Sequence, residues 1–154
     1  MKIFVTVGNH PIPFTRLFNK IEELSCKTAH EFFVQTGRTD FVFTRAVSAP
    51  FLDTIAMQDR LRSSDLVITH GGWGTIEECL EQNLKVIAVP KIIGIEHGHS
   101  QEELVAALKK LGLLLVAYDI NTLDHLIEIS QSFKPQRFIK GSSAEIIKKF
   151  IDEN

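Results

Sequence analysis

The sequence predicts an α/β fold, a doubly wound and mostly parallel sheet in a single Rossmann-like domain that spans residues 1–154. Two observations lead to this prediction. Helical and strand patterns alternate along the chain, and the strand candidates are continuous apolar runs, which is typical of strands covered by helices on both faces. A chain of 154 residues also has about the length of one domain and can bury a core without disulfides.

The predicted elements begin with an apolar strand at residues 2–7, followed by the loop GNHPIP. A helix is expected from Pro13, because proline suits a first helical position. The apolar residues that follow keep the i, i+3, i+4, i+7 spacing of one stripe: Phe14, Leu17, Phe18, Ile21 and Leu24. Two short strands are expected next, EFFVQT at 31–36 and FVFTRA at 41–46, on either side of Gly37.

The alternation continues to the end of the chain. The remaining predicted elements are, in order, a helix at 53–63, a strand at 66–69, a helix at 75–82, a strand at 85–89, a helix at 100–111, a strand at 113–117 and helices at 122–132 and 142–152. Ser142 and Glu145 have the spacing of a capping box, which marks the start of the last helix.

Composition and charge argue against several classes of protein. The formal net charge is -2 at pH 7, from 17 basic and 19 acidic residues in no long runs, which argues against a nucleic-acid-binding surface. No apolar run approaches the ~18 residues of a membrane span, and the apolar start is too short for a signal peptide. Cys26 and Cys79 lack CxxC spacing and are predicted as buried thiols, so we expect a cytoplasmic protein.

The stretch HGGWGTIEE joins a predicted strand to a predicted helix through Gly71, Gly72 and Gly74. Glycines there expose backbone N–H groups at a helix start, where the first donors are unpaired and the helix dipole is positive, so a phosphate-bearing ligand is favoured. The alternative is a turn that uses glycine for its conformation alone. The dinucleotide pattern GxGxxG fails at Glu77, and the chain contains no P-loop pattern.

Three residues near these glycines have two possible roles each. Glu78 lies one turn into the helix, where its carboxylate can accept hydrogen bonds from ribose hydroxyls. Alternatively, it is an acid of the first turn that interacts favourably with the positive end of the helix dipole, and Glu77 fits this second role even better. His70 can fix the turn by hydrogen bonding or act as a base, and the first role is favoured. Trp73 can stack on a ligand or pack over the turn.

The histidines after the next strand give little support to a metal site. His97 and His99 lie two residues apart, and only Glu96 and Glu102 are near them in the sequence. Because a loop site usually needs three or four ligands, we expect no bound metal.

With HGGWGTIEE, KVIAVP, a histidine-rich loop and QEELVAALKKLG, the chain resembles the carboxy-terminal, donor-binding half of GT-B glycosyltransferases of the MurG-like family. The opening FVTVGNHPIPFTRL is similar to that of the split members, the bacterial capsule and exopolysaccharide proteins and the eukaryotic dolichol-pathway subunit, which form only the donor half. The resemblance covers nearly the whole chain and implies half of a GT-B fold.

The resemblance implies donor-binding residues in three loops. They are Gly8, Asn9 and His10 in the first loop, Gly71, Gly72, Trp73, Gly74 and Thr75 in the glycine turn, with Glu78 for the ribose, and His99, Gln101 and Glu103 in the third region. No catalytic base is assigned to this chain, because the family resemblance places it on the partner.

The implied function is that of a donor-binding subunit of a UDP-sugar-dependent inverting glycosyltransferase that acts on a lipid-linked saccharide in polysaccharide biosynthesis. The implied partner is a membrane-anchored, acceptor-binding subunit that recruits the chain from the cytoplasm to the inner face of the membrane. UDP-sugar is then a substrate, no cofactor is expected, and backbone donors rather than a metal stabilise the leaving diphosphate.

Two other functions remain open. A non-catalytic nucleotide-sugar sensor or scaffold is supported by Asn9, where the family commonly has threonine, and by Ser100-Gln101 in place of the usual His-Gln pair. A nucleotide-dependent oxidoreductase is disfavoured because the glycine fingerprint is absent.

An obligate partner would leave apolar side chains exposed on the isolated chain. The candidates at the predicted ligand edge are Trp73, Ile92, Ile93 and Ile95, and the alternative for each is internal packing.

Overall fold

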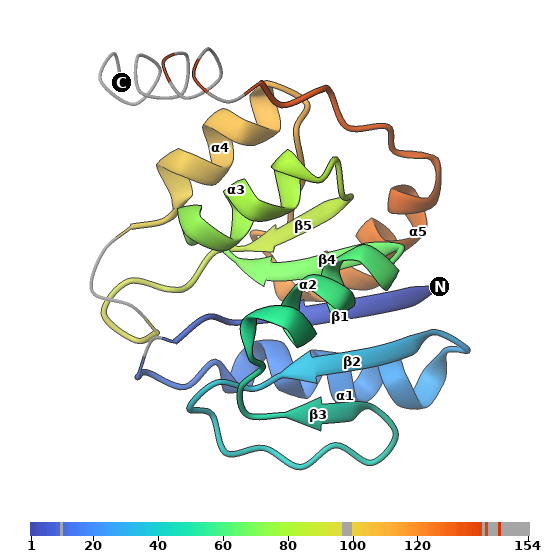
Figure 1. Cartoon of the computed structure of the whole chain (residues 1–154). Coiled ribbons are helices and arrows are strands. Elements are labelled where there is room, and N and C mark those ends of the chain that lie inside the picture. The colour runs from blue at the N-terminus through green and yellow to red at the C-terminus, as the bar shows by residue number, and fades with distance from the viewer. Residues whose placement is uncertain (10, 97–99, 140, 142–144, 146–154) are drawn as a thin grey trace.

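The described strands form one parallel sheet. In the computed structural model, which describes residues 1–9, 11–96, 100–139, 141 and 145, the strand order is β3-β2-β1-β4-β5-β6 (Figure 1). Every neighbouring pair is parallel. The strands are β1 Lys2–Thr6, β2 Glu31–Gln35, β3 Val47–Ala49, β4 Leu66–His70, β5 Val86–Val89 and β6 Leu115–Val116. The predicted Rossmann-like sheet is confirmed, and its strand order reverses between β1 and β4.

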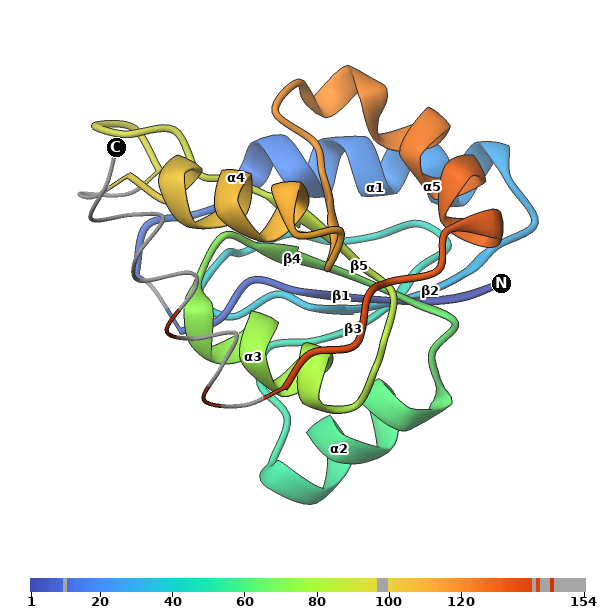
Figure 2. The same cartoon turned by 90° about the horizontal axis from the view of Figure 1, so that it is seen from above.

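Helices cover both faces of the sheet. They are α1 Thr15–Lys27, α2 Thr54–Ser63, α3 Trp73–Glu81, α4 Glu102–Lys110 and α5 Leu123–Ser132, with a 3-10 turn η1 at Ile120–Thr122. Figure 2 shows α1 and α5 on one side of the sheet and α2 and α3 on the other. Helix α4 packs with α3, since its buried Val105 and Leu108 share a core cluster with Ile76 and Cys79.

The strands are apolar at successive positions because both faces of the sheet are buried. In β1, Ile3 and Val5 belong to the core that contains α1 and α5, whereas Phe4 belongs to the core of α2, α3 and α4. Successive side chains of a strand point to opposite faces, so a strand with helices on both sides needs an uninterrupted apolar run. This is the physical reason that these strands could be predicted from sequence.

The predicted strand at 41–46 is wrong. The third strand lies at Val47–Ala49, and the apolar residues before it pack against α1 instead. The rings of Phe41 and Phe43 have their centroids 5.7 and 5.6 Å from that of Phe18, with edge-on geometry. The apolar run of this segment therefore reflects ring packing on a helix and not pairing in a sheet.

The other described elements agree with the predicted ones within two residues at either end. The predicted helix at 142–152 and its cap at Ser142 lie outside the described residues, apart from Glu145. Cys79 is buried as predicted, which raises the pKa of its thiol to about 12. Cys26 is exposed, so that prediction is wrong, because its side chain lies off the buried stripe of α1. Within the described ranges, none of the helices has the length and apolar character that a membrane span requires.

The packing of the segment before β3 gives a stability prediction. Phe18 is fully buried under two rings, whereas Val42, between those rings in sequence, is 87% exposed. Phe18→Ala should lower the free energy of unfolding by about 3–5 kcal/mol because it leaves a cavity, and Val42→Ala should change it by less than about 0.5 kcal/mol. Urea unfolding followed by circular dichroism measures both. A large loss for Val42→Ala would contradict the loop assignment.

Candidate functional site

Three loops meet at the carboxyl edge of the sheet, where β1, β4 and β5 end. The strand order places these ends side by side, with β4 in the middle. In doubly wound sheets, ligands bind at this edge, next to the point where the strand order reverses. The loops are residues 7–14, 71–72 and 90–101, of which residues 10 and 97–99 lie outside the described residues.

The ring of His70, the last residue of β4, is packed between two glycines. A Cβ atom on Gly8 would lie 2.9 Å from His70 Cε1, and a Cβ atom on Gly72 would lie 2.2 Å from His70 Nε2. Gly8 also has a φ of 67°, which residues with a side chain rarely adopt. His70 Nδ1 lies 3.3 Å from the hydroxyl of Thr69. Both glycines are therefore required by the histidine, which holds the loop after β1 against the glycine turn.

The third neighbouring glycine is required by Gln101. A Cβ atom on Gly71 would lie 2.7 Å from Gln101 Cβ. The Gln101 side chain is 7% exposed, and its Oε1 accepts hydrogen bonds from Gly71 N–H at 3.1 Å and from Lys91 N–H at 3.2 Å. Its carbonyl oxygen therefore joins the glycine turn to the end of β5. A donor contact by Gln101 stays a prediction.

Gly74 differs from these three glycines because a Cβ atom there would meet no atom within 4 Å. It lies in the first turn of α3, whose N-cap residue Gly72 makes no side-chain capping bond. The first hydrogen bond of this helix runs from Ile76 N–H to Gly72 O, so the amides of residues 73–75 have no partner within the helix. Unpaired donors, a positive helix end and open space beside Gly74 form a place that suits a phosphate group.

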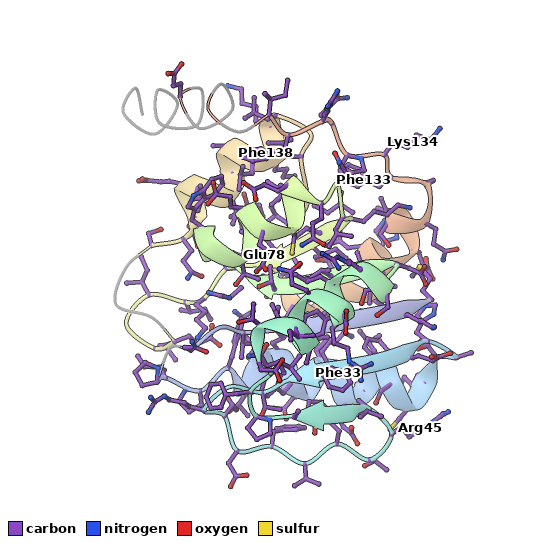
Figure 3. All side chains as sticks on the ribbon, in the orientation of Figure 1. Phe33, Arg45, Glu78, Phe133, Lys134 and Phe138 are labelled. Carbon is purple, nitrogen blue, oxygen red and sulfur yellow. The ribbon has the colours of Figure 1, made fainter. Side chains whose placement is uncertain are left out.

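Glu78 lies at the contact between α3 and α2, and Figure 3 labels it there. Its Oε1 accepts a hydrogen bond from Gln58 Nε2 of α2. Gln58 Oε1 in turn accepts from Gln82 Nε2 at 3.1 Å. Sequence reasoning missed Gln58, and the spacing within α2 gives no signal for it. A ribose bound by Glu78 would share this carboxylate with Gln58.

The remaining predicted residues are dispersed around the edge. Asn9 and Glu103 are exposed and Thr75 is half-buried, while His10 and His99 lie outside the described residues. Trp73 is half-buried, with its ring centroid 6.0 Å from that of Phe138, so packing accounts for its position in the described structure. No group of His, Cys, Asp or Glu in the described part of the chain is arranged to hold a metal ion.

The predicted apolar patch is present for three of its four members. Ile92, Ile93 and Ile95 are 44%, 55% and 69% exposed. The segment that carries them is held by an ion pair between Arg16 of α1 and Glu96, in which Nε and Nη2 donate to the two carboxylate oxygens at 3.0 and 2.8 Å. No local sequence pattern indicates this pair, because its residues lie 80 positions apart.

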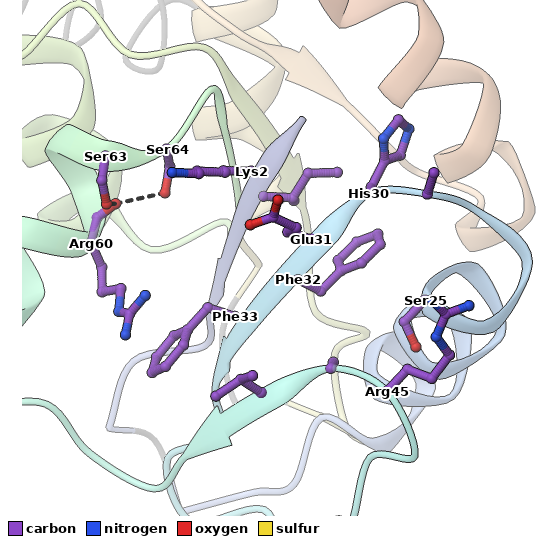
Figure 4. Close-up of a pocket in the computed structure, with 14 residues that line it drawn as sticks. Lys2, Ser25, His30, Glu31, Phe32, Phe33, Arg45, Arg60, Ser63 and Ser64 are labelled. Atoms are coloured by element: carbon purple, nitrogen blue, oxygen red, sulfur yellow. Dashed lines mark hydrogen bonds between the residues drawn. The ribbon is translucent and has the colours of Figure 1, made fainter.

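Two hollows in the described part of the chain lie away from the predicted residues. One, of about 430 Å³, lies at the amino ends of the strands and is shown in Figure 4, with Lys2, Glu31, Phe33, Arg45 and Arg60 in its lining. Another, of about 320 Å³, lies beside Gly37 at the carboxyl ends of β2 and β3. The predicted donor-binding residues line neither of them.

The sequence matches the family model described as the glycosyltransferase family 28 C-terminal domain over residues 2–153. The chain belongs to this family. Among curated proteins, none matches the sequence.

Solved structures with the same fold include glycosyltransferases. The solution structure of ALG13 superposes with a TM-score of 0.66 at 18% identity, covering 99% of this chain and 96% of that one. The calicheamicin glycosyltransferase CalG4 gives 0.63 at 14% identity, and MurG of Acinetobacter baumannii gives 0.58 at 15%. Each again covers 99% of this chain, which spans 38% of CalG4 and 46% of MurG. The family 28 chain therefore has the GT-B half fold.

The contacts of the glycines predict opposite effects of two alanine substitutions. Gly72→Ala should lower the free energy of unfolding by about 1–3 kcal/mol, because the new methyl group meets the His70 ring. Gly74→Ala should raise it by about 0.4–1 kcal/mol, because the methyl group meets open space within a helix. Thermal and urea unfolding measure both values.

A double-mutant cycle tests the cause of the first effect. His70→Ala should remove most of the cost of Gly72→Ala, since the clashing ring is gone. Equal costs in both backgrounds would contradict the packing of His70 against Gly72.

Proposed function

We propose that this chain is the donor-binding subunit of a UDP-sugar-dependent inverting glycosyltransferase that acts on a lipid-linked saccharide in polysaccharide biosynthesis. The observation that carries the proposal is the open start of α3 beside Gly74, at the carboxyl edge of a family 28 domain. The likeness to ALG13, whose structure superposes over 99% of this chain and 96% of that one, supports the proposal.

In the proposed reaction, the acceptor hydroxyl attacks the anomeric carbon of the donor sugar with inversion. The bond between that carbon and the β-phosphate oxygen breaks, UDP leaves with the bonding electrons, and the acceptor proton passes to a base on the partner. The amides of residues 73–75 and the positive end of α3 stabilise the charge on the leaving diphosphate. The proposal assigns this stabilisation to the protein backbone and requires no divalent metal or cofactor.

The proposed partner is a membrane-anchored, acceptor-binding subunit that recruits this chain to the inner face of the membrane from the cytoplasm. Exposed Ile92, Ile93 and Ile95 support a contact with another protein, because they lie in one segment beside the candidate edge. The ion pair of Arg16 and Glu96 holds this segment in place, so the apolar side chains are presented without a large ordering cost.

A non-catalytic nucleotide-sugar sensor or scaffold is the alternative. Ser100 supports it, because its Oγ accepts a hydrogen bond from Glu102 N–H at 3.2 Å, within the protein itself, at a position where the family has histidine. Such a protein would bind UDP-sugar and yet support no transfer with any partner.

Binding of UDP tests the donor site. Glu78→Ala should weaken UDP binding about tenfold to a hundredfold, because one charge-assisted hydrogen bond to the ribose is lost. Titration calorimetry in the presence of a chelator measures the affinity, and the chelator should leave wild-type binding unchanged. Glu81→Ala, an exposed acid on the same helix, is the matched control and should bind UDP like the wild type. Equal affinities for wild type and Glu78→Ala would exclude this role of Glu78.

Transfer assays test the partner. The purified chain should show only background transfer from UDP-glucose, UDP-galactose or UDP-N-acetylglucosamine to membrane lipid acceptors, because orientation of the acceptor contributes about 7–11 kcal/mol in well-aligned reactions. Co-expression with the membrane-anchored subunit should restore turnover. Full turnover by the chain alone would refute the subunit role.

A charged substitution in the isoleucine segment separates the partner contact from donor binding. Ile95→Asp should lower the activity of the assembled enzyme while leaving the UDP affinity of the chain unchanged. Ile55→Asp is the matched control, because Ile55 is 76% exposed on α2. Equal activity of the two variants would argue against a contact through Ile95.

A further inference from the structure

Lys91 is a buried lysine directly beyond β5, at the edge that carries the candidate site. Lys91 is only 2% exposed. Its N–H donates to the same Gln101 oxygen that accepts from Gly71 N–H, so its main chain lies beside the glycine turn. Its Nζ donates to Ile12 O at 3.4 Å, in the loop after β1. The side chain therefore connects the end of β5 with the loop after β1.

The ammonium of Lys91 has no carboxylate within 4.0 Å in the described part of the chain. The carboxylate of Glu96 binds other groups: it accepts two hydrogen bonds from Arg16 and one from Ile92 N–H at 2.9 Å. The described neighbours of Lys91 Nζ are Ile12 O and the Phe14 ring, whose centroid lies 5.2 Å away. A lysine ammonium carries three donors, so this environment satisfies it only in part.

Next to Glu96, the cations outnumber the carboxylates. Arg16 and Lys91 supply two cations against the single carboxylate of Glu96. Burial lowers the pKa of Lys91, and the charge of Glu96 opposes this effect. A buried cation without a close counter-ion is costly, and the cost falls when an anion binds nearby.

We infer that Lys91 supplies the positive charge that receives the diphosphate of the donor nucleotide, together with the amides at the start of α3. This inference rests on the proposed donor-binding function. Lys91 has two roles in this proposal: it holds the loop of Gly8 and Asn9 through Ile12 O, and it places a cation at the edge of the sheet where its own main chain is joined to the glycine turn through Gln101. The helix end alone offers partial charges, and Lys91 adds a full one.

Ligands that differ only in their number of phosphates test whether the Lys91 ammonium interacts with the diphosphate. Lys91→Met should weaken UDP binding about tenfold to a hundredfold, weaken UMP binding less and leave uridine binding unchanged, because only the phosphates interact with the charge. Lys91→Arg should retain most of the UDP affinity. Lys109→Met is the matched control, since Lys109 Nζ also lies over a ring, 5.3 Å from the centroid of Tyr118, at the far end of α4.

The outcomes separate this inference from the proposed function. Absence of UDP binding by the wild-type chain would overturn both. Wild-type binding of UDP, with equal losses for UDP and uridine in Lys91→Met, would overturn the inference alone and leave Lys91 as a tether of the loop.

If Lys91→Met fails to fold, the inference can be tested on the wild-type chain instead. The NMR signal of the Lys91 side-chain Cε should shift when UDP is added and stay in place when uridine is added. An unchanged signal with UDP would overturn the inference.

Discussion

The packing of the His70 ring between Gly8 and Gly72 fixes the carboxyl edge of the sheet at the point where the strand order reverses. The ring belongs to the last residue of β4, one glycine follows β1, and the other lies in the turn into α3. A side chain at either glycine would displace the ring. Because Gln101 joins the same turn to the end of β5, three strand ends are held in one arrangement by two side chains.

This arrangement gives the glycines separate roles. Three of them, Gly8, Gly71 and Gly72, have no room for a side chain because the protein's own atoms fill the space. Gly74 alone among these positions faces open space, at a helix start whose amides are unpaired. A glycine-rich loop is commonly explained by a bound phosphate, and here one position fits that explanation while the others serve the packing that presents it.

Charge at the same edge follows from tertiary contacts between distant parts of the chain. Arg16 and Glu96 anchor the segment with the exposed isoleucines, and their pairing leaves Lys91 without a close carboxylate in the described structure. The same ion pair therefore affects two features, the apolar segment proposed to contact the partner and the buried Lys91 proposed to interact with the diphosphate. A change that breaks it would affect both.

The sequence by itself determined the parallel sheet, the positions of most helices and the loops at its carboxyl edge, because strands buried on both faces must be apolar throughout and helices must repeat their apolar positions every three to four residues. It misplaced the third strand, since Phe41 and Phe43 pack on Phe18 and a short apolar run does not reveal what its side chains contact. Only the tertiary structure decided that Gln58 shares the carboxylate of Glu78, that Gln101 bonds to the glycine turn and that Lys91 is buried. These contacts join elements that are separated along the chain, and local periodicity carries no information about which side chains meet once the elements have packed.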